Sequence, residues 1–178
     1  MSIALTLLPD GDGISSSNWV AVGETNRHQC LDDNNGDTSY VKCSTDTDTM
    51  IITYADPSVA EADIDTITSV RFLSSGRSND RRNAALVDIG FQTPSGNVST
   101  SCSYNAHVSS HETINGATKI YSDGLLGGTD WTYSDLENLE MICTKDGTQT
   151  VFLGYLALKV IYEPAVSADN ATFFGANF

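Results

Sequence analysis

The sequence predicts an all-β protein, an antiparallel β-sandwich of jelly-roll-like type with one short helix and extended terminal arms. Three observations support this class. Apolar and polar residues alternate with period two in many segments, and turn-forming residues separate these segments at intervals of roughly eight to twenty positions. Ser and Thr together make up 39 of the 178 residues. Such a chain can build sheets with one buried and one wet face, as antiparallel sandwiches do.

The alternation is clearest over residues 98–106, where one parity reads Val, Thr, Cys, Tyr, Ala and the other reads Ser, Ser, Ser, Asn. This pattern is typical of a half-buried strand. By the same reasoning we expect strands, in chain order, over residues 39–43, 50–54, 66–73, 85–92, 98–106, 118–121 and 139–143. Turn signals separate several of them, among them Asn35-Gly36, Pro94-Ser95-Gly96 and Asp146-Gly147.

The last expected strand, residues 151–162, is apolar on both parities. A strand covered on both faces and flanked on both sides needs such a pattern, so this segment should be central in its sheet. Its β-branched and aromatic residues disfavour a helix. Glu163-Pro164 should end the strand, because proline has no backbone N–H to donate to the sheet.

One short helix is expected over residues 132–139, just before the strand at 139–143. Ser134 with Glu137 three positions later matches a capping box, in which each side chain accepts a hydrogen bond at the helix start. Trp131 precedes the helix. It is expected to plug one end of the sandwich, and stacking on a ligand is the alternative.

The length of 178 residues indicates one domain, expected over residues 18–164, with arms at 1–17 and 165–178. The C-terminal arm carries three phenylalanines that would be an aggregation liability on a free tail. It should therefore dock, either on a neighbouring subunit or back on its own sandwich. The expected interface residues of the two arms are Ile3, Leu5, Leu7, Phe173, Phe174 and Phe178.

Charge and cysteine content narrow the classes of partner. The net charge is −14, with 9 Lys and Arg against 23 Asp and Glu, so neither a nucleic acid nor an anionic membrane is an expected partner. Four arginines, Arg71, Arg77, Arg81 and Arg82, fall close together and could form one local basic patch. The four cysteines form no C-x-x-C pair, which leaves buried thiols and disulfides as open alternatives.

Motifs that would indicate an enzyme or a metal protein do not emerge from the sequence. It contains no G-x-S-x-G, G-x-G-x-x-G or G-x-x-x-x-G-K-[ST] pattern, and the H-E-x-x-H pattern started by His111-Glu112 fails at Asn115. We therefore expect no catalysis and no cofactor. Calcium is the one metal to consider, with Asp32, Asp33 and Asp37 as candidate ligands. Lys42 stands where an EF-hand loop requires a bidentate Glu.

Several features together resemble small β-sandwich virion proteins of tailed bacteriophages. They are Trp19, the acidic stretch 32–41, the Ile-x-x-Val-x-Phe pattern of 67–72, the segment 131–139 and the closing Val-Ile-Tyr-Glu-Pro of 160–164. The resemblance implies a structural role on the outer surface of a virion assembled in the host cytoplasm. The implied function is that of a capsid decoration or cement protein that binds the major capsid protein or other virion proteins as a homo-oligomer.

The alternative is a neck, tail or fibre component that binds a receptor or a carbohydrate. Sugar rings stack on aromatic side chains, and the candidates for such stacking are Trp19, Tyr40, Trp131 and Tyr133. A glycoside hydrolase that uses two carboxylates, such as the Asp63-Ile64-Asp65 pair, is the weakest of the three hypotheses.

Overall fold

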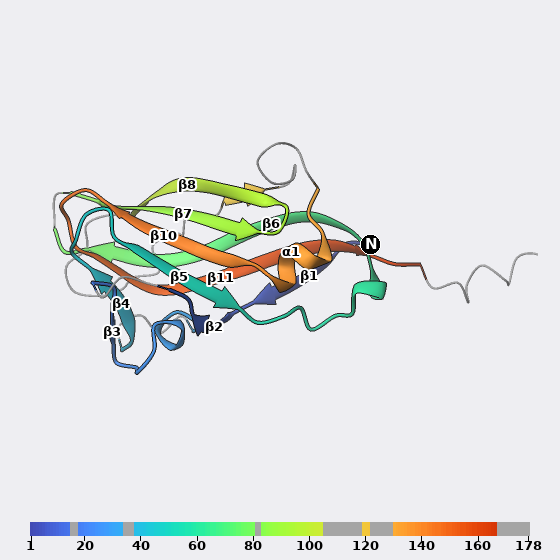
Figure 1. Cartoon of the computed structure of the whole chain (residues 1–178), viewed down its shortest axis with the longest axis horizontal. Coiled ribbons are helices and arrows are strands. Elements are labelled where there is room, and N and C mark those ends of the chain that lie inside the picture. The colour runs from blue at the N-terminus through green and yellow to red at the C-terminus, as the bar shows by residue number, and fades with distance from the viewer. Residues whose placement is uncertain (15–17, 34–37, 81–82, 105–118, 122–129, 167–178) are drawn as a thin grey trace, which may run out of the picture.

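Two antiparallel sheets pack face to face in the computed structural model, which describes residues 1–14, 18–33, 38–80, 83–104, 119–121 and 130–166 (Figure 1). The all-β antiparallel sandwich predicted from the sequence is confirmed. In the described part of the chain the only α-helix, α1, spans Tyr133–Glu137. No helix there is long and apolar enough to cross a membrane.

Sheet A has six strands in the order β3-β4-β11-β6-β9, and β1 also pairs with β11. Their bounds are β1 Ile3–Leu7, β3 Val20–Val22, β4 Tyr40–Cys43, β6 Ile64–Ser78, β9 Lys119–Tyr121 and β11 Val151–Pro164. Sheet B has five strands in the order β2-β5-β10-β7-β8. Their bounds are β2 Pro9–Asp12, β5 Thr49–Tyr54, β7 Ala85–Thr93, β8 Gly96–Tyr104 and β10 Glu140–Asp146. Two short 3-10 turns, η1 (His28–Cys30) and η2 (Glu61–Asp63), lie in the connections.

The central position predicted for residues 151–162 is confirmed. β11 pairs with β6 along one side, and with β4 and then β1 along the other. Leu153, Leu156 and Leu158 are fully buried between the sheets. The turn before β11 uses Gly147 at φ 79°, a backbone conformation that glycine adopts without steric cost, so the Asp146-Gly147 turn signal is also confirmed.

The core lies between the sheets and is built from the inward parity of each strand. Trp19, Phe72, Phe91 and Met141 are among its largest fully buried side chains. Phe91 stacks edge-to-face on Phe72 at 6.1 Å between ring centroids. Three cysteines have described side chains: Cys30, Cys43 and Cys143. All three are buried free thiols, so the buried-thiol alternative is confirmed for them and the disulfide alternative is not. Burial raises the pKa of Cys30 and of Cys43.

The N-terminal segment corrects the expectation of a separate arm over residues 1–17. Ile3–Leu7 pair in register with Tyr162–Leu158 of β11, and β2 then pairs with β5 in the other sheet. The segment therefore crosses from one sheet to the other as part of the sandwich. The physical reason is that β4 covers only the Val151–Leu153 end of β11, so β1 supplies hydrogen bonds to the rest of that side.

The helix cap also differs from the sequence-based expectation. Thr132, not Ser134, caps α1, and Asp135 rather than Glu137 closes the capping box. The helix is shorter than predicted at both ends, because Leu136 and Leu139 must both reach the core and the chain re-enters a strand at Glu140. Strand β3 is an element that the sequence did not predict, and β6 is longer than predicted at both ends.

Candidate functional site

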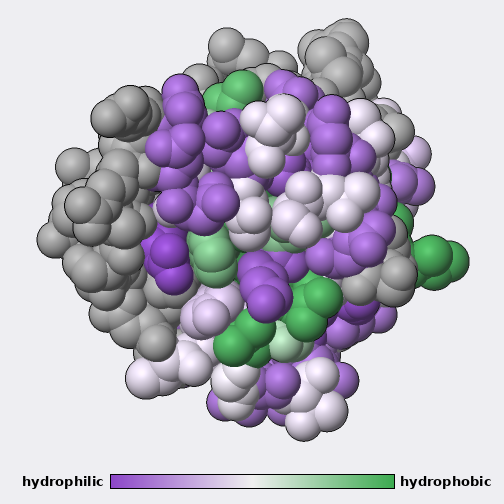
Figure 2. Space-filling view, turned by 90° about the vertical axis from the view of Figure 1, so that its left-hand side faces the viewer, coloured by the Kyte–Doolittle hydropathy of each residue, from purple (hydrophilic) through white to green (hydrophobic). Residues whose placement is uncertain are grey.

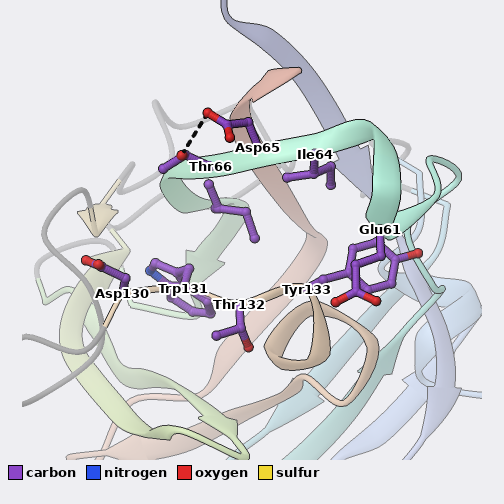
Figure 3. Close-up of a pocket in the computed structure, with 9 residues that line it drawn as sticks. Glu61, Ile64, Asp65, Thr66, Asp130, Trp131, Thr132 and Tyr133 are labelled. Carbon is purple, nitrogen blue, oxygen red and sulfur yellow. Dashed lines mark hydrogen bonds between the residues drawn. The ribbon is translucent and has the colours of Figure 1, made fainter. Parts of the chain in front are cut away.

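A pocket of about 320 Å³ lies where the start of β6 meets the segment that leads into α1 (Figure 3). Glu61 of η2 and Ile64, Asp65 and Thr66 of β6 line one side. Asp130, Trp131, Thr132 and Tyr133 line the other. Two of the four aromatic residues predicted as sugar-stacking candidates, Trp131 and Tyr133, thus share one pocket with three carboxylates.

The α1 side of this pocket is held by the carboxylate of Asp135, which is fully buried. Its Oδ2 accepts hydrogen bonds from the backbone N of Thr132 at 2.8 Å and from Thr132 Oγ1 at 2.7 Å. Its Oδ1 accepts one from the backbone N of Ser95 at 3.0 Å, which ties α1 to the β7–β8 hairpin. Burial by itself would raise the pKa of Asp135, but these hydrogen bonds outweigh it and the pKa is lowered.

Trp131 is a wall of the pocket and a part of the core. Only 5% of the residue is exposed, and its ring packs edge-to-face on Phe91 at 6.0 Å between centroids. The sequence-based expectation that Trp131 plugs a sandwich end is confirmed. Its buried indole nitrogen lies on the Asp130 side of the ring, and among the described residues it has no hydrogen-bond acceptor (Figure 3).

Tyr133 is half-buried, and its hydroxyl donates a hydrogen bond to the carbonyl of Val59 at 2.9 Å. Partial desolvation and the nearby carboxylates of Glu137, Asp56 and Glu61 raise its pKa. The ring is thereby fixed beside Glu61 at one side of the pocket (Figure 3). Carboxylates and a fixed aromatic ring can bind polar ligands that donate hydrogen bonds, so binding is the chemistry this pocket offers.

The other two aromatic candidates lie elsewhere. Trp19 is 1% exposed, and its Nε1 donates to the carbonyl of Asp48 at 3.0 Å, so it is a core residue and offers no stacking face. Tyr40 lies on sheet A, with its ring 5.5 Å from that of Phe152 in an edge-to-face contact. The four aromatic residues therefore do not form one common platform.

The end of the sandwich beside this pocket also holds both ends of the described chain (Figure 1). The amino group of Met1 contacts Glu163 Oε2 at 3.1 Å, and Ser2 Oγ donates to Glu163 Oε1 at 2.6 Å. These two partners lower the pKa of Glu163. We call the surface formed by Met1, Ile3 and Glu163–Val166 the terminal end. The described residues at the opposite end are mainly hydrophilic, with a group of apolar residues below the centre of the view in Figure 2.

Three of the described large apolar side chains with high exposure lie at the terminal end. Met1 is fully exposed, Val166 is 87% exposed and Ile3 is 43% exposed. Ile3 is thus available as the interface residue that the sequence predicts, whereas Leu5 is half-buried and Leu7 lies in the chain's own core. Leu7 is therefore removed from the predicted interface set. Phe173, Phe174 and Phe178 lie outside the described residues.

The calcium candidates are only partly described. Asp32 is half-buried and Asp33 is exposed, both just after η1, and Asp37 lies outside the described residues. Within the described ranges no group of three or more His, Cys, Asp or Glu side chains is placed to hold a metal ion. The calcium hypothesis thus stays a prediction from the sequence.

Sequence reasoning missed most of the pocket's carboxylates. Glu61 and Asp130 were not singled out from the sequence, and Asp65 was noted only as a member of an Asp-x-Asp pair. The three meet because β6 starts where α1 begins in space, a contact between segments about 65 residues apart that no local pattern encodes. No protein-family model matches the chain, and no curated protein has significant sequence similarity to it.

Proposed function

We propose that the chain is a structural protein of a virus particle, of the capsid decoration or cement type, which binds the assembled head and stabilises it without catalysis. Its partner would be the major capsid protein or another virion protein on the outer surface of the particle, and several copies would act together. The observation that carries the proposal is the gathering of both ends of the described chain, with the exposed Met1, Ile3 and Val166, at the terminal end.

Exposed apolar side chains beside a chain end are suited to binding a protein surface. Removing each of these side chains from water lowers the free energy of the bound state. A terminal segment can also add contact area when it becomes ordered on binding. The described chain stops at residue 166 at this same end, and the three phenylalanines of the predicted arm follow it in the sequence. The net charge of −14 would keep the remaining surface in solvent and the particles apart.

Replacing Ile3 by serine is expected to weaken binding to particles about tenfold, because a central apolar contact contributes on the order of 1.4 kcal/mol. Deleting residues 165–178 should abolish binding while the β circular dichroism signal persists. The measurement is co-sedimentation of the purified chain with particles that lack it. Leu8→Ser is the matched control, since Leu8 is 40% exposed but lies beyond β1 and away from the terminal end.

Leu8→Ser should bind as the unchanged chain does. Equal binding by the unchanged chain, Ile3→Ser and the deletion variant would remove the terminal end from the attachment surface.

A second candidate, carbohydrate binding by a neck, tail or fibre component, is favoured by the pocket between β6 and α1. Tyr133 offers a fixed ring edge, the carboxylates can accept hydrogen bonds from sugar hydroxyls, and a ligand oxygen could approach the indole side of Trp131. A glycan array separates the two candidates. A protein that only attaches to a capsid should bind no sugar, whereas a receptor-binding module should retain specific glycans and lose them on Glu61→Ala, because Glu61 lies beside Tyr133 (Figure 3).

A further inference from the structure

The outer face of sheet A concentrates positive charge. The strands alternate, with Val41, Phe72 and Leu158 fully buried, so the intervening positions face outward. Those outward positions include Lys42 of β4, Arg71 and Arg77 of β6, and Lys159 of β11. Lys159 is the cross-strand partner of Arg71, and Phe152 is the partner of both Arg77 and Lys42. Four of the nine Lys and Arg residues of an acidic chain thus share one face.

An aromatic side chain lies among these cations. The guanidinium carbon of Arg77 lies 4.0 Å from the ring centroid of Phe152, and the ring of Tyr40 makes an edge-to-face contact with Phe152 at 5.5 Å between centroids. Next to Phe152 is a depression of about 350 Å³ whose lining includes Lys42, Val20 and neutral polar residues. None of the described residues that line it carries a carboxylate. This face, which we call the basic face, is therefore suited to an acidic partner surface that also offers apolar contacts.

The outer face of sheet B carries the opposite charge. Its outward positions include Asp10 of β2, Asp88 of β7, and Glu140 and Asp146 of β10. Lys145 is directed inward and is fully buried. Among the described outward residues of β2, β5, β7 and β10 there is no Lys or Arg. We call this the acidic face.

The centre of the acidic face is apolar and uncharged. Ile51 and Ile142 are cross-strand partners and are half-buried, and Thr49 Oγ1 lies 3.3 Å from Thr144 Oγ1 beside them. The basic face likewise has half-buried Leu73 between Arg71 and Arg77, and half-buried Ile161 two residues beyond Lys159. The two outer faces of one molecule are thus complementary in charge and similar in their apolar centres.

We propose that copies of this chain associate face to face, with the basic face of one copy packed on the acidic face of the next. Two copies of the same face would repel each other, so the contact is heterologous, and an open stack exposes one free basic face at one end and one free acidic face at the other. Successive contacts of this type generate a ring or an open stack. The inference concerns association between copies, and it holds whether or not the terminal end binds a capsid.

The dimensions of the faces set the expected strength. Four strands about 4.8 Å apart, over about nine residues of 3.4 Å each, give a footprint of roughly 600 Å², or about 1,200 Å² buried in total. That value is at the low end for specific complexes. The net charge of −14 also opposes association at long range, but at 0.15 M salt charges are screened beyond about 8 Å. We therefore expect weak, reversible association at this ionic strength.

The test is sedimentation equilibrium of the full chain over a wide concentration range at 0.15 M salt. One variant cancels the charge of the basic face (Lys42→Glu with Lys159→Glu), because the two new carboxylates offset Arg71 and Arg77. A second cancels the charge of the acidic face (Glu140→Lys with Asp146→Lys), because the two new ammonium groups offset Asp10 and Asp88. A third carries all four substitutions; it keeps the net charge of −14 and is the matched control for overall charge.

The unchanged chain should form dimers and larger species, and each single-face variant should associate at least about tenfold more weakly. The variant with all four substitutions should associate as weakly as the single-face variants, although its net charge is unchanged. A one-to-one mixture of the two single-face variants should form heterodimers, because the intact basic face of one meets the intact acidic face of the other. This rescue also shows that the variants are folded. A monomeric unchanged chain would overturn the proposal, even if its basic face bound poly-glutamate. Failure of the mixture to associate, with both variants folded as judged by circular dichroism, would overturn it too.

Discussion

Replacing Leu7 by alanine is expected to lower the free energy of unfolding by about 2–5 kcal/mol, as for other buried leucines truncated to alanine. Leu7 is 2% exposed and belongs to the core cluster. It is the cross-strand partner of Leu158, which is itself fully buried next to Phe72. The loss combines the apolar surface no longer buried with the cavity left behind. Urea unfolding followed by circular dichroism measures it.

Leu8→Ala is the matched control for this prediction. Leu8 is the next residue and is 40% exposed, so its truncation should change the free energy of unfolding by no more than about 0.5 kcal/mol. The pair therefore distinguishes a strand that is part of the sandwich from an extended arm. Equal and small effects of the two substitutions would mean that residues 3–7 are not docked on β11 in solution.

Asp135→Ala is expected to cost about 2–4 kcal/mol of unfolding free energy at neutral pH, the second large effect. The substitution removes the helix cap partner and leaves the backbone N–H groups of Thr132 and Ser95 without their charged acceptor. Glu137→Ala is the control, since Glu137 is the exposed residue that the sequence suggested for this role, and it should change stability by less than about 0.5 kcal/mol. A larger loss of stability for Glu137→Ala than for Asp135→Ala would instead support the Ser134–Glu137 capping box.

The contribution of Asp135 should also depend on pH. Because the pKa of Asp135 is lowered in the folded state, the carboxylate stabilises the fold fully above its ordinary value near 3.8. This stabilisation is lost as the pH falls through the lowered folded-state pKa. The difference in unfolding free energy between the unchanged chain and Asp135→Asn should thus be constant above about pH 5 and should shrink below pH 4. A difference that grows on acidification would contradict the assigned hydrogen bonds.

Most strands could be predicted because their information is local. The alternation at 85–92 reflects one buried and one wet face, and this strand pairs with β8 across the Pro94-Ser95 turn as the sequence indicates. The doubly apolar run at 151–162 indicated a strand flanked on both sides, and β11 is that strand. Residue patterns within one segment were sufficient in these cases.

The errors arise where partners distant in the chain decide the outcome. Ile3, Leu5 and Leu7 share a parity that fits a strand as well as an arm, and only the uncovered part of β11 selects the strand. At α1 the sequence analysis singled out Ser134 with Glu137, whereas the structure uses Thr132 with Asp135. Ser95, 40 residues upstream, favours this pair by donating a hydrogen bond to Asp135. Neither β11, as the partner of Ile3–Leu7, nor Ser95, as the partner of Asp135, can be identified from the residues near those segments in the sequence.

The candidate surfaces were even less accessible to sequence reasoning. Trp131 and Tyr133 were predicted as candidates, but their carboxylate neighbours come from two segments that meet only in the fold. The opposite charges of the two outer faces were hidden within a net charge of −14. Of the four arginines that are clustered in the sequence, Arg71 and Arg77 contribute to the basic face. Arg81 and Arg82 lie outside the described residues.

Quantitative mass spectrometry of purified virions from the genome that encodes this chain tests the proposed role most directly. A capsid decoration protein should be present in hundreds of copies per particle, in fixed ratio to the major capsid protein. A few copies per particle would assign the chain to the neck, tail or fibre instead of the head. Absence of the chain from purified particles would contradict a structural role in the virion.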